Sequence, residues 1–165
     1  MTRRDLAGEQ PTRGRPTLYL MVGLPGAGKT TRAREIEADH AALRLTPDEW
    51  ILALYGADLD RPQRDAVRDP VEALQWRVAE RALALGCNVV LDWGFWSRAE
   101  RAEYRARAAA LGADARVVFL DAPLDDLWVR VARRGESAAG TLQITRAELA
   151  AWAALFEPPG EDELR

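Results

Sequence analysis

Cysteine, histidine and lysine each occur only once in this chain of 165 residues, as Cys87, His40 and Lys29. A single cysteine excludes an internal disulfide and a cysteine-based metal cluster. The chain also has no apolar run that approaches the roughly 18 residues of a membrane-spanning helix, and residues 1–16 lack the central apolar segment of a secretory signal. We therefore expect a cytoplasmic protein whose residues 1–16 form a flexible tail.

An excess of positive charge is absent as well. Charged residues make up 30% of the chain and the formal net charge is −3, so no overall basic field attracts nucleic acid. A polyanionic partner would need a local basic patch.

Four short apolar runs alternate with segments of helical character. They cover residues 17–22, 43–46, 88–91 and 116–120, and each is short enough to be a buried strand. Capping residues and proline mark the helix starts, and glycine marks most helix ends. The alternation predicts an α/β protein with a mostly parallel sheet of four or five strands. We expect one domain over residues 17–165, with a loop over 56–65 and a helix that opens at Asp69 and Pro70.

Lys29 belongs to the glycine-rich stretch GLPGAGKTT at residues 23–31, whereas every other member of the 23 Lys and Arg residues is Arg. Residues 23–30 fit G-x-x-x-x-G-K-[ST] between a predicted strand and a predicted helix, which is the context that this motif requires. Glycines let successive backbone N–H groups point at phosphate oxygens, and the helix N-terminus adds partial positive charge. The compact ammonium of Lys29 suits the outer phosphates, where it would assist catalysis, while a forked guanidinium does not fit inside the loop.

This motif extends the prediction to a three-layer α/β/α P-loop NTPase fold. The hydroxyl of Thr30 is expected on Mg²⁺. The residues expected to bind ATP here are Gly23, Leu24, Pro25, Gly26, Ala27, Gly28, Lys29, Thr30 and Thr31.

Two carboxylates lie where predicted strands end. Asp92 follows the run at 88–91, at the edge where open α/β sheets bind ligands, and we expect it to hold Mg²⁺ through water; the alternative is a turn residue. Asp48 lies in the first turn of the helix that opens with Thr46. If Glu49 completes a capping box with Thr46, Asp48 is left free to accept a proton from an attacking hydroxyl as general base. The alternative is an acid that only favours the helix dipole.

Arg130, Arg133 and Arg134 share one face of a predicted helix because they are spaced i, i+3 and i+4. A segment of small residues follows, so residues 133–145 are expected to form a lid. The arginines could close over ATP and stabilise charge on the transferring phosphoryl group, with Arg133 or Arg134 as the catalytic one and Arg130 on the nucleotide. The alternative is a solvated basic face.

Residues 93–98 place three aromatic side chains in a segment directly after Asp92. Trp93, Phe95 and Trp96, with Trp50 nearby, could stack a planar or apolar acceptor, or they could pack under a neighbouring helix. Arg98 opens a helix, where the dipole disfavours a cation, so we expect it to bind an anionic group of the acceptor or nucleotide.

The stretches GLPGAGKTT, LTPDEW, VVLDWGFWSRAERAEYRARAAALG and VVFLDAPLDDLWVRVARR cover most of residues 17–134. Together they resemble the P-loop kinases related to polynucleotide 5′-kinase, chloramphenicol phosphotransferase and zeta toxin, and AAA-type predicted bacterial kinases with a D-W-G-x-W-x-R segment. The resemblance implies a general-base role for Asp48, acceptor contacts for residues 93–98 and lid arginines at 130–134. The chain departs from the nucleic-acid kinases in having no basic strand-binding channel, and it is shorter than the zeta toxins.

The favoured function is ATP-dependent, Mg-assisted transfer of the γ-phosphate to a hydroxyl of a small-molecule acceptor, such as an antibiotic or a nucleoside-like compound. One alternative is a polynucleotide 5′-hydroxyl kinase. Another is a nucleotide-dependent regulatory ATPase without an acceptor. Expected partners are a nucleotide and a small molecule, with nucleic acid less favoured and no membrane, in a monomer or homodimer.

Overall fold

The computed structural model describes residues 14–137 and 144–164, and side chains in the first range through Arg133. Most of the expected tail and residues 138–143 of the expected lid lie outside the described residues. No helix within the described ranges is long and apolar enough to cross a membrane.

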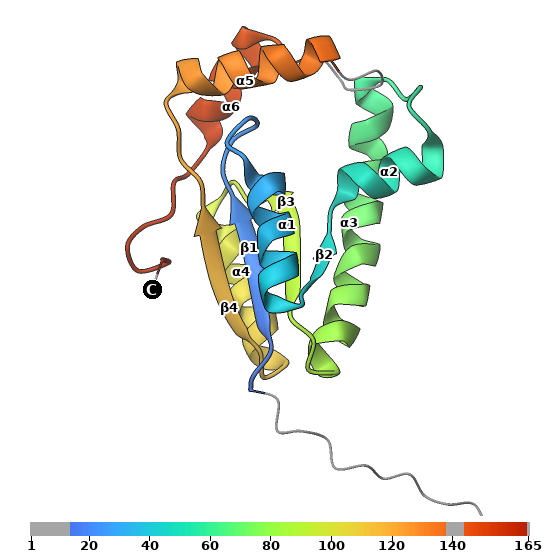
Figure 1. Ribbon diagram of the computed structural model, residues 1–165, viewed down its shortest axis with the longest axis vertical. Helices are drawn as coiled ribbons and strands as arrows, with labels where there is room; N and C mark the ends of the chain where they lie inside the picture. The colour runs from blue at the N-terminus through green and yellow to red at the C-terminus, as the bar shows by residue number, and fades with distance from the viewer. Residues whose placement is uncertain (1–13, 138–143, 165) are drawn as a thin grey trace, which may run out of the picture.

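Four parallel strands form one sheet (Figure 1). The strands are β1 (Thr17–Val22), β2 (Leu43–Leu45), β3 (Val89–Gly94) and β4 (Asp114–Phe119), in the order β2-β3-β1-β4. The two central strands are buried along almost their whole length, which is why they read as continuous apolar runs. The predicted parallel α/β sheet is therefore confirmed with four strands among the described residues.

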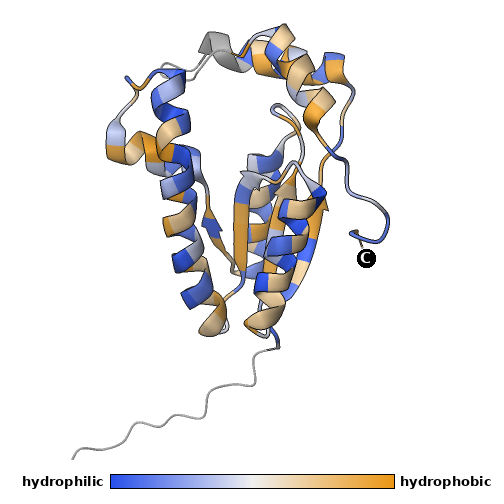
Figure 2. Cartoon of the chain, turned by 180° about the vertical axis from the view of Figure 1, so that it is seen from behind, coloured by the Kyte–Doolittle hydropathy of each residue, from blue (hydrophilic) through white to orange (hydrophobic). Residues whose placement is uncertain are grey.

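Helices cover both faces of the sheet. They are α1 (Lys29–His40), α2 (Pro47–Tyr55), α3 (Arg61–Ala84), α4 (Arg98–Ala110), α5 (Leu124–Ser137) and α6 (Arg146–Leu155). Alternate residues of β1 face the helices on opposite sides of the sheet. Leu18 and Leu20 pack with α3 and α4, whereas Tyr19 and Met21 pack with Ile36 of α1. Figure 2 shows hydrophobic colour along the central strands, whereas the helices outside them carry both polar and hydrophobic colour, and the three layers agree with the predicted architecture.

The helix α3 begins earlier than the sequence analysis placed it. Asp60 is its N-cap: its carboxylate accepts from Gln63 N and the Gln63 side chain accepts from Asp60 N, both at 2.9 Å. Pro70 lies inside the helix, although proline usually marks a boundary. The expected loop over 56–65 is therefore wrong in its second half, and the correction adds two helical turns that face the cavity described below.

Candidate active site

A cavity of about 1030 Å³ opens at the carboxyl edge of the sheet. Figure 1 shows α5 and α6 lying across this edge, above the loop that joins β1 to α1, with α2 and α3 on the far side. The cavity wall is built from that loop, the end of β3 and the facing turns of α2, α3, α5 and α6. This position agrees with the rule that open α/β sheets bind ligands at the carboxyl ends of their strands.

The glycine-rich loop is packed so closely that two of its glycines, Gly23 and Gly26, have no room for a side chain. A Cβ on Gly23 would lie 2.6 Å from the carbonyl oxygen of Leu120, and a Cβ on Gly26 would lie 2.8 Å from that of Leu127. Both residues also have positive φ, at 146° and 85°. Sterics therefore require glycine at these two positions.

The N-terminus of α1 is left open toward the cavity. Its N-cap is Gly28, with φ of 95°, and no side chain caps the helix or contributes an acid to the first turn. First-turn N–H groups without side-chain partners are the usual anion site at a helix N-terminus. Lys29 bends back over the loop, and its Nζ donates to the carbonyl of Leu24 at 3.0 Å.

Asp92 lies in β3, two residues before Gly94, and its side chain is only 2% exposed. Burial raises the pKa of Asp92, while a hydrogen bond from the Thr30 hydroxyl and the charges of Lys29 and Arg44 lower it. Its Oδ2 is buried without a hydrogen-bond partner and forms an ion pair with Nη1 of Arg44 at 3.8 Å.

The Asp92 carboxylate, hydrogen-bonded to Thr30 at the cavity, fits a hydrated Mg²⁺, which binds through one or two oxygen groups and substrate phosphates. Among the described residues no cluster of His, Cys, Asp or Glu could cage a metal by itself, which is consistent with that binding mode.

Arg44 of β2 connects three elements around the site. Its guanidinium binds Glu49 of α2 at 2.7 and 2.9 Å and Glu37 of α1 at 3.2 Å. Burial lowers the pKa of Arg44, but these two carboxylates outweigh burial and raise it. Glu49 is therefore engaged by arginine, and the side chain of Thr46 makes no capping bond. The expected capping box is wrong at this helix because a buried guanidinium competes for the carboxylate.

Asp48 lines the cavity and its carboxylate is 79% exposed. It is not free, as the sequence analysis expected, because its Oδ1 accepts from Nη1 of Arg68 at 3.3 Å. Arg68 also donates to the carbonyl of Trp93 at 3.1 Å and to Glu72 at 2.8 Å. Burial raises the pKa of Glu72 to about 7, against the opposing charge of Arg68. Arg68 thus ties the candidate base to α3 and to the end of β3.

Of the three predicted lid arginines, Arg130 reaches the glycine-rich loop. Its Nη1 donates to the carbonyl of Gly26 at 3.4 Å, and it lines the cavity. Arg133 is exposed and is not among the residues that line the cavity. The side chain of Arg134 lies outside the described part of the chain.

The aromatic residues divide between the core and the cavity. Trp93 and Phe95 stack on each other with ring centroids 5.7 Å apart and are 8% and 2% exposed, and Nε1 of Trp93 donates to Gln75 at 2.9 Å. Trp50 packs against the same core and is not a lining residue. Trp93, Phe95 and Trp96 all line the cavity, but Trp93 and Phe95 are buried, so Trp96 is the most accessible of these three expected acceptor contacts.

Arg98 faces away from the cavity. It binds Asp162 at 2.5 Å in an exposed ion pair and does not line the cavity wall. The expectation that it contacts an acceptor or nucleotide is therefore corrected, because a carboxylate of the C-terminal segment takes its charge.

The sequence analysis missed two sets of lining residues. Arg61, Arg64 and Arg68 occupy one face of α3 at i, i+3 and i+7, a spacing that becomes visible only once the cap at Asp60 is recognised. Trp152 of α6 lies 5.8 Å from Trp96 between ring centroids, and Arg61 lies over its ring while binding Glu148 at 3.4 Å. These contacts join α3 to α6 over the cavity.

The fold and this cavity define the class of the protein. A glycine-rich loop follows the first strand of a parallel sheet, and an open helix N-terminus lies behind the loop. This arrangement is typical of a P-loop kinase. The family model of the AAA_33 type, described as an AAA domain, matches residues 18–159. The chain therefore belongs to this family, and the resemblance to P-loop kinases is confirmed.

Solved structures with the same fold include a chain of the Pnkp1/Rnl/Hen1 RNA repair complex, with a TM-score of 0.71 and 21% identity over 90% of this chain and 46% of that chain. This protein thus spans about half the length of that relative. A gluconokinase from Sinorhizobium meliloti 1021 has a TM-score of 0.59 and 20% identity over 92% of this chain and 82% of its own.

The APS kinase CysC of Mycobacterium tuberculosis, in complex with AMPPNP and APS, has a TM-score of 0.55 and 27% identity over 75% of this chain and 77% of its own. Comparison with curated proteins gives no match.

Proposed function

We propose that this protein transfers the γ-phosphate of ATP to a hydroxyl of a small-molecule acceptor, with Mg²⁺ bound by Thr30 and Asp92. One observation carries the proposal: the open helix N-terminus and the carboxylate-bearing residues Asp92 and Asp48 all line one cavity. A phosphotransferase needs a phosphate cradle, a place for a cation and a base in that arrangement.

The protein's own residues then have distinct roles. The loop residues 23–31 hold the phosphates through backbone N–H groups, Lys29 neutralises the outer phosphates, and Arg130 approaches them from α5. When bound, Mg²⁺ supplies further neutralisation of phosphate charge. Arg133 and Arg134 remain candidates for contact with the transferring group.

In the reaction, the acceptor oxygen forms a bond to the γ-phosphorus while the bond from that phosphorus to the bridging oxygen breaks, and the electron pair leaves with ADP. The hydroxyl proton passes to Asp48. Arg68 orients Asp48 through the 3.3 Å ion pair. Trp96, at the cavity wall, provides an aromatic face for the acceptor.

A panel of hydroxyl-bearing compounds with γ-labelled ATP tests this function. Asp48→Asn should lower transfer by orders of magnitude while the nucleotide still raises the melting temperature. Asp39→Asn, an exposed carboxylate in the last turn of α1, is the matched control and should transfer at the parent rate. Label released only to water, at equal rates in the parent and Asp48→Asn, would favour a regulatory ATPase instead.

The arginine row at Arg61, Arg64 and Arg68 favours a second candidate, a polynucleotide 5′-hydroxyl kinase. An acceptor with several phosphates would bind with an affinity that falls steeply between about 50 and 200 mM salt. Binding of a short single-stranded oligonucleotide across this range separates the two candidates, since a small neutral acceptor shows no such slope.

A further inference from the structure

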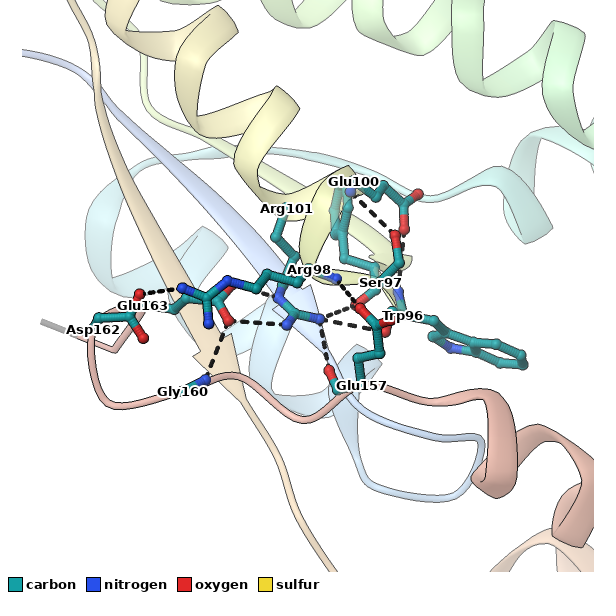
Figure 3. A network of polar contacts seen from close by, with 10 residues as sticks. Trp96, Ser97, Arg98, Glu100, Arg101, Glu157, Gly160, Asp162 and Glu163 are labelled. Atoms are coloured by element: carbon teal, nitrogen blue, oxygen red, sulfur yellow. Dashed lines mark hydrogen bonds and ion pairs between the residues drawn. The ribbon is translucent and has the colours of Figure 1, made fainter.

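The C-terminal segment, residues 156–164, returns from α6 to the start of α4 and ends in a buried ion pair. Nε of Arg101 donates to Oε2 of Glu163 at 2.7 Å, and Nη2 donates to Oε1 at 3.0 Å. The side chains of Arg101 and Glu163 are 0% and 4% exposed. Figure 3 shows this pair at the centre of a polar network between the segment and α4.

The polar atoms of the pair are satisfied almost completely. Oε1 of Glu163 also accepts from Gly160 N at 3.1 Å, and Nη1 of Arg101 donates to the carbonyl of Glu157 at 2.9 Å. A buried ion pair contributes little net stability over an apolar contact, and its best-attested use is to select one geometry.

The network selects the position of the Trp96 peptide. Its carbonyl accepts from Glu157 N at 3.0 Å, and its N–H donates to Oε2 of Glu100 at 3.1 Å. The next turn is held too, because Arg98 N donates to Oε2 of Glu157 at 2.7 Å. Nη1 of Arg101 lies 3.4 Å from the carbonyl of Trp96. Backbone and side-chain groups of Glu157 thus bind both sides of this turn (Figure 3).

The indole of Trp96 in turn lies beside the phosphate-binding lysine. The position that a Cβ on Gly94 would occupy is 3.3 Å from Nε1 of Trp96 and 3.7 Å from Cε of Lys29. The other neighbour of the ring is Trp152, on the helix that leads into the C-terminal segment. The segment therefore holds Trp96, a partly exposed aromatic residue of the cavity wall, through its backbone, while α6 contacts its ring.

We propose that residues 156–164 form a positioning strap for the acceptor wall, in which Arg101, Glu157 and Glu163 are positioning residues that fix Trp96 beside Lys29. The contact between wall and acceptor rests on the proposed phosphotransfer, whereas the fixing of Trp96 does not. Without the strap, the turn at residues 95–98 keeps its link to β3 and α4 but loses the contacts that fix the orientation of the Trp96 peptide.

Fluorine NMR of the full chain labelled with 5-fluorotryptophan tests the strap directly. The six tryptophans give six resonances, and Trp96→Phe assigns that of Trp96. Glu163→Gln removes the charge of the pair and should shift or broaden the resonances of Trp96 and Trp152. Those of Trp50, Trp76 and Trp128 should stay in place, because the residues lie elsewhere in the fold.

Asp162→Asn is the matched control. It removes a carboxylate from the same segment but breaks only the exposed pair with Arg98, so all six resonances should keep their positions. A Trp96 resonance that Glu163→Gln leaves unchanged in position and width overturns the proposal.

If Glu163→Gln does not fold, Glu157→Gln decides. It keeps the buried pair and weakens only the bond to Arg98 N, so it should shift Trp96 and leave the three reference resonances unchanged. An unmoved Trp96 in that folded variant also refutes the strap.

Kinetics provide the second readout. Once an acceptor is found, Glu163→Gln should raise its KM several-fold while the rise in melting temperature with ATP stays that of the parent. A parent protein that transfers no phosphate to any acceptor refutes the proposed function but leaves the NMR result standing as the test of the strap.

Discussion

Glu72 makes the stability of this protein depend on pH in a direction that its position dictates. It lies on α3 with a side chain 20% exposed, and its Oε1 accepts from Arg68 at 2.8 Å. Burial raises its pKa from the ordinary 4.5 to about 7, the charge of Arg68 opposes the rise, and the charges of Glu100 and Asp69 add to it. The ionised form of Glu72 therefore has a higher free energy in the folded than in the unfolded chain.

The sign of this pH dependence follows from the number of protons that Glu72 binds in the folded and in the unfolded state. Between pH 4.5 and about 7 the folded protein holds a proton on Glu72 that the unfolded chain has released, so the free energy of unfolding falls as pH rises across this window. Each pH unit corresponds to about 1.4 kcal/mol. The contribution is thus roughly 3 kcal/mol at most, reduced by the access of water to the exposed edge of the carboxyl.

Glu72→Gln removes the charge and keeps the shape. We expect nearly equal stability of variant and parent at pH 4, and a variant more stable by about 2–3 kcal/mol at pH 8. Urea unfolding followed by circular dichroism at half-unit steps of pH measures this difference. Asp65→Asn, at an exposed position of the same helix, controls for the loss of one negative charge. A Glu72→Gln variant that is no more stable than the parent at pH 8 would refute the assignment of a strained, buried carboxylate.

Three further predictions concern the site. Lys29→Ala should abolish the rise in melting temperature that nucleotide gives the parent, which is roughly 5–10 °C at 100 times Kd, and an unchanged rise would remove the phosphate cradle. Gly26→Ala should cost about 1–3 kcal/mol in urea unfolding, because its Cβ meets the carbonyl of Leu127 at 2.8 Å; Gly112→Ala, with φ of 72° but open space, should cost only about 1 kcal/mol. Arg68→Met should lower phosphotransfer at least tenfold with the nucleotide-dependent rise in melting temperature retained, and a parent-like rate would show that Asp48 needs no orientation by α3.

Some elements of this structure could be predicted from the sequence because they depend on interactions between neighbouring residues. The glycine-rich loop, its strand and its helix follow from steric rules that act within about ten residues, and the structure places all three as predicted. The last helix also opens with a local signal, a capping box formed by Thr145 and Glu148. Such signals depend on neighbours in the chain and need no knowledge of the fold.

The errors arose where a side chain on another helix or strand competes for a local partner. Glu49 was expected to cap its own helix and instead binds Arg44, and Asp48 was expected to be free and instead binds Arg68, twenty residues away. Arg101 and Glu163 are separated by 62 positions, so no helical spacing relates them. Local rules could not detect contacts that arise only when β2, α3 and the C-terminal segment are placed against the sheet.

The division of residues 92–96 between core and cavity, in contrast, was available from a rule of strands alone. Side chains alternate between the two faces of a strand, and β3 extends to Gly94, beyond the expected end at residue 91. Val89, Leu91 and Trp93 belong to the core on the α3 and α4 side, so the residues between them face α1 and its Thr30. The alternation that buries Trp93 is therefore the same one that presents Asp92 to the phosphate site. Gly94, the next residue on that face, leaves the space beside which both Lys29 and Trp96 lie.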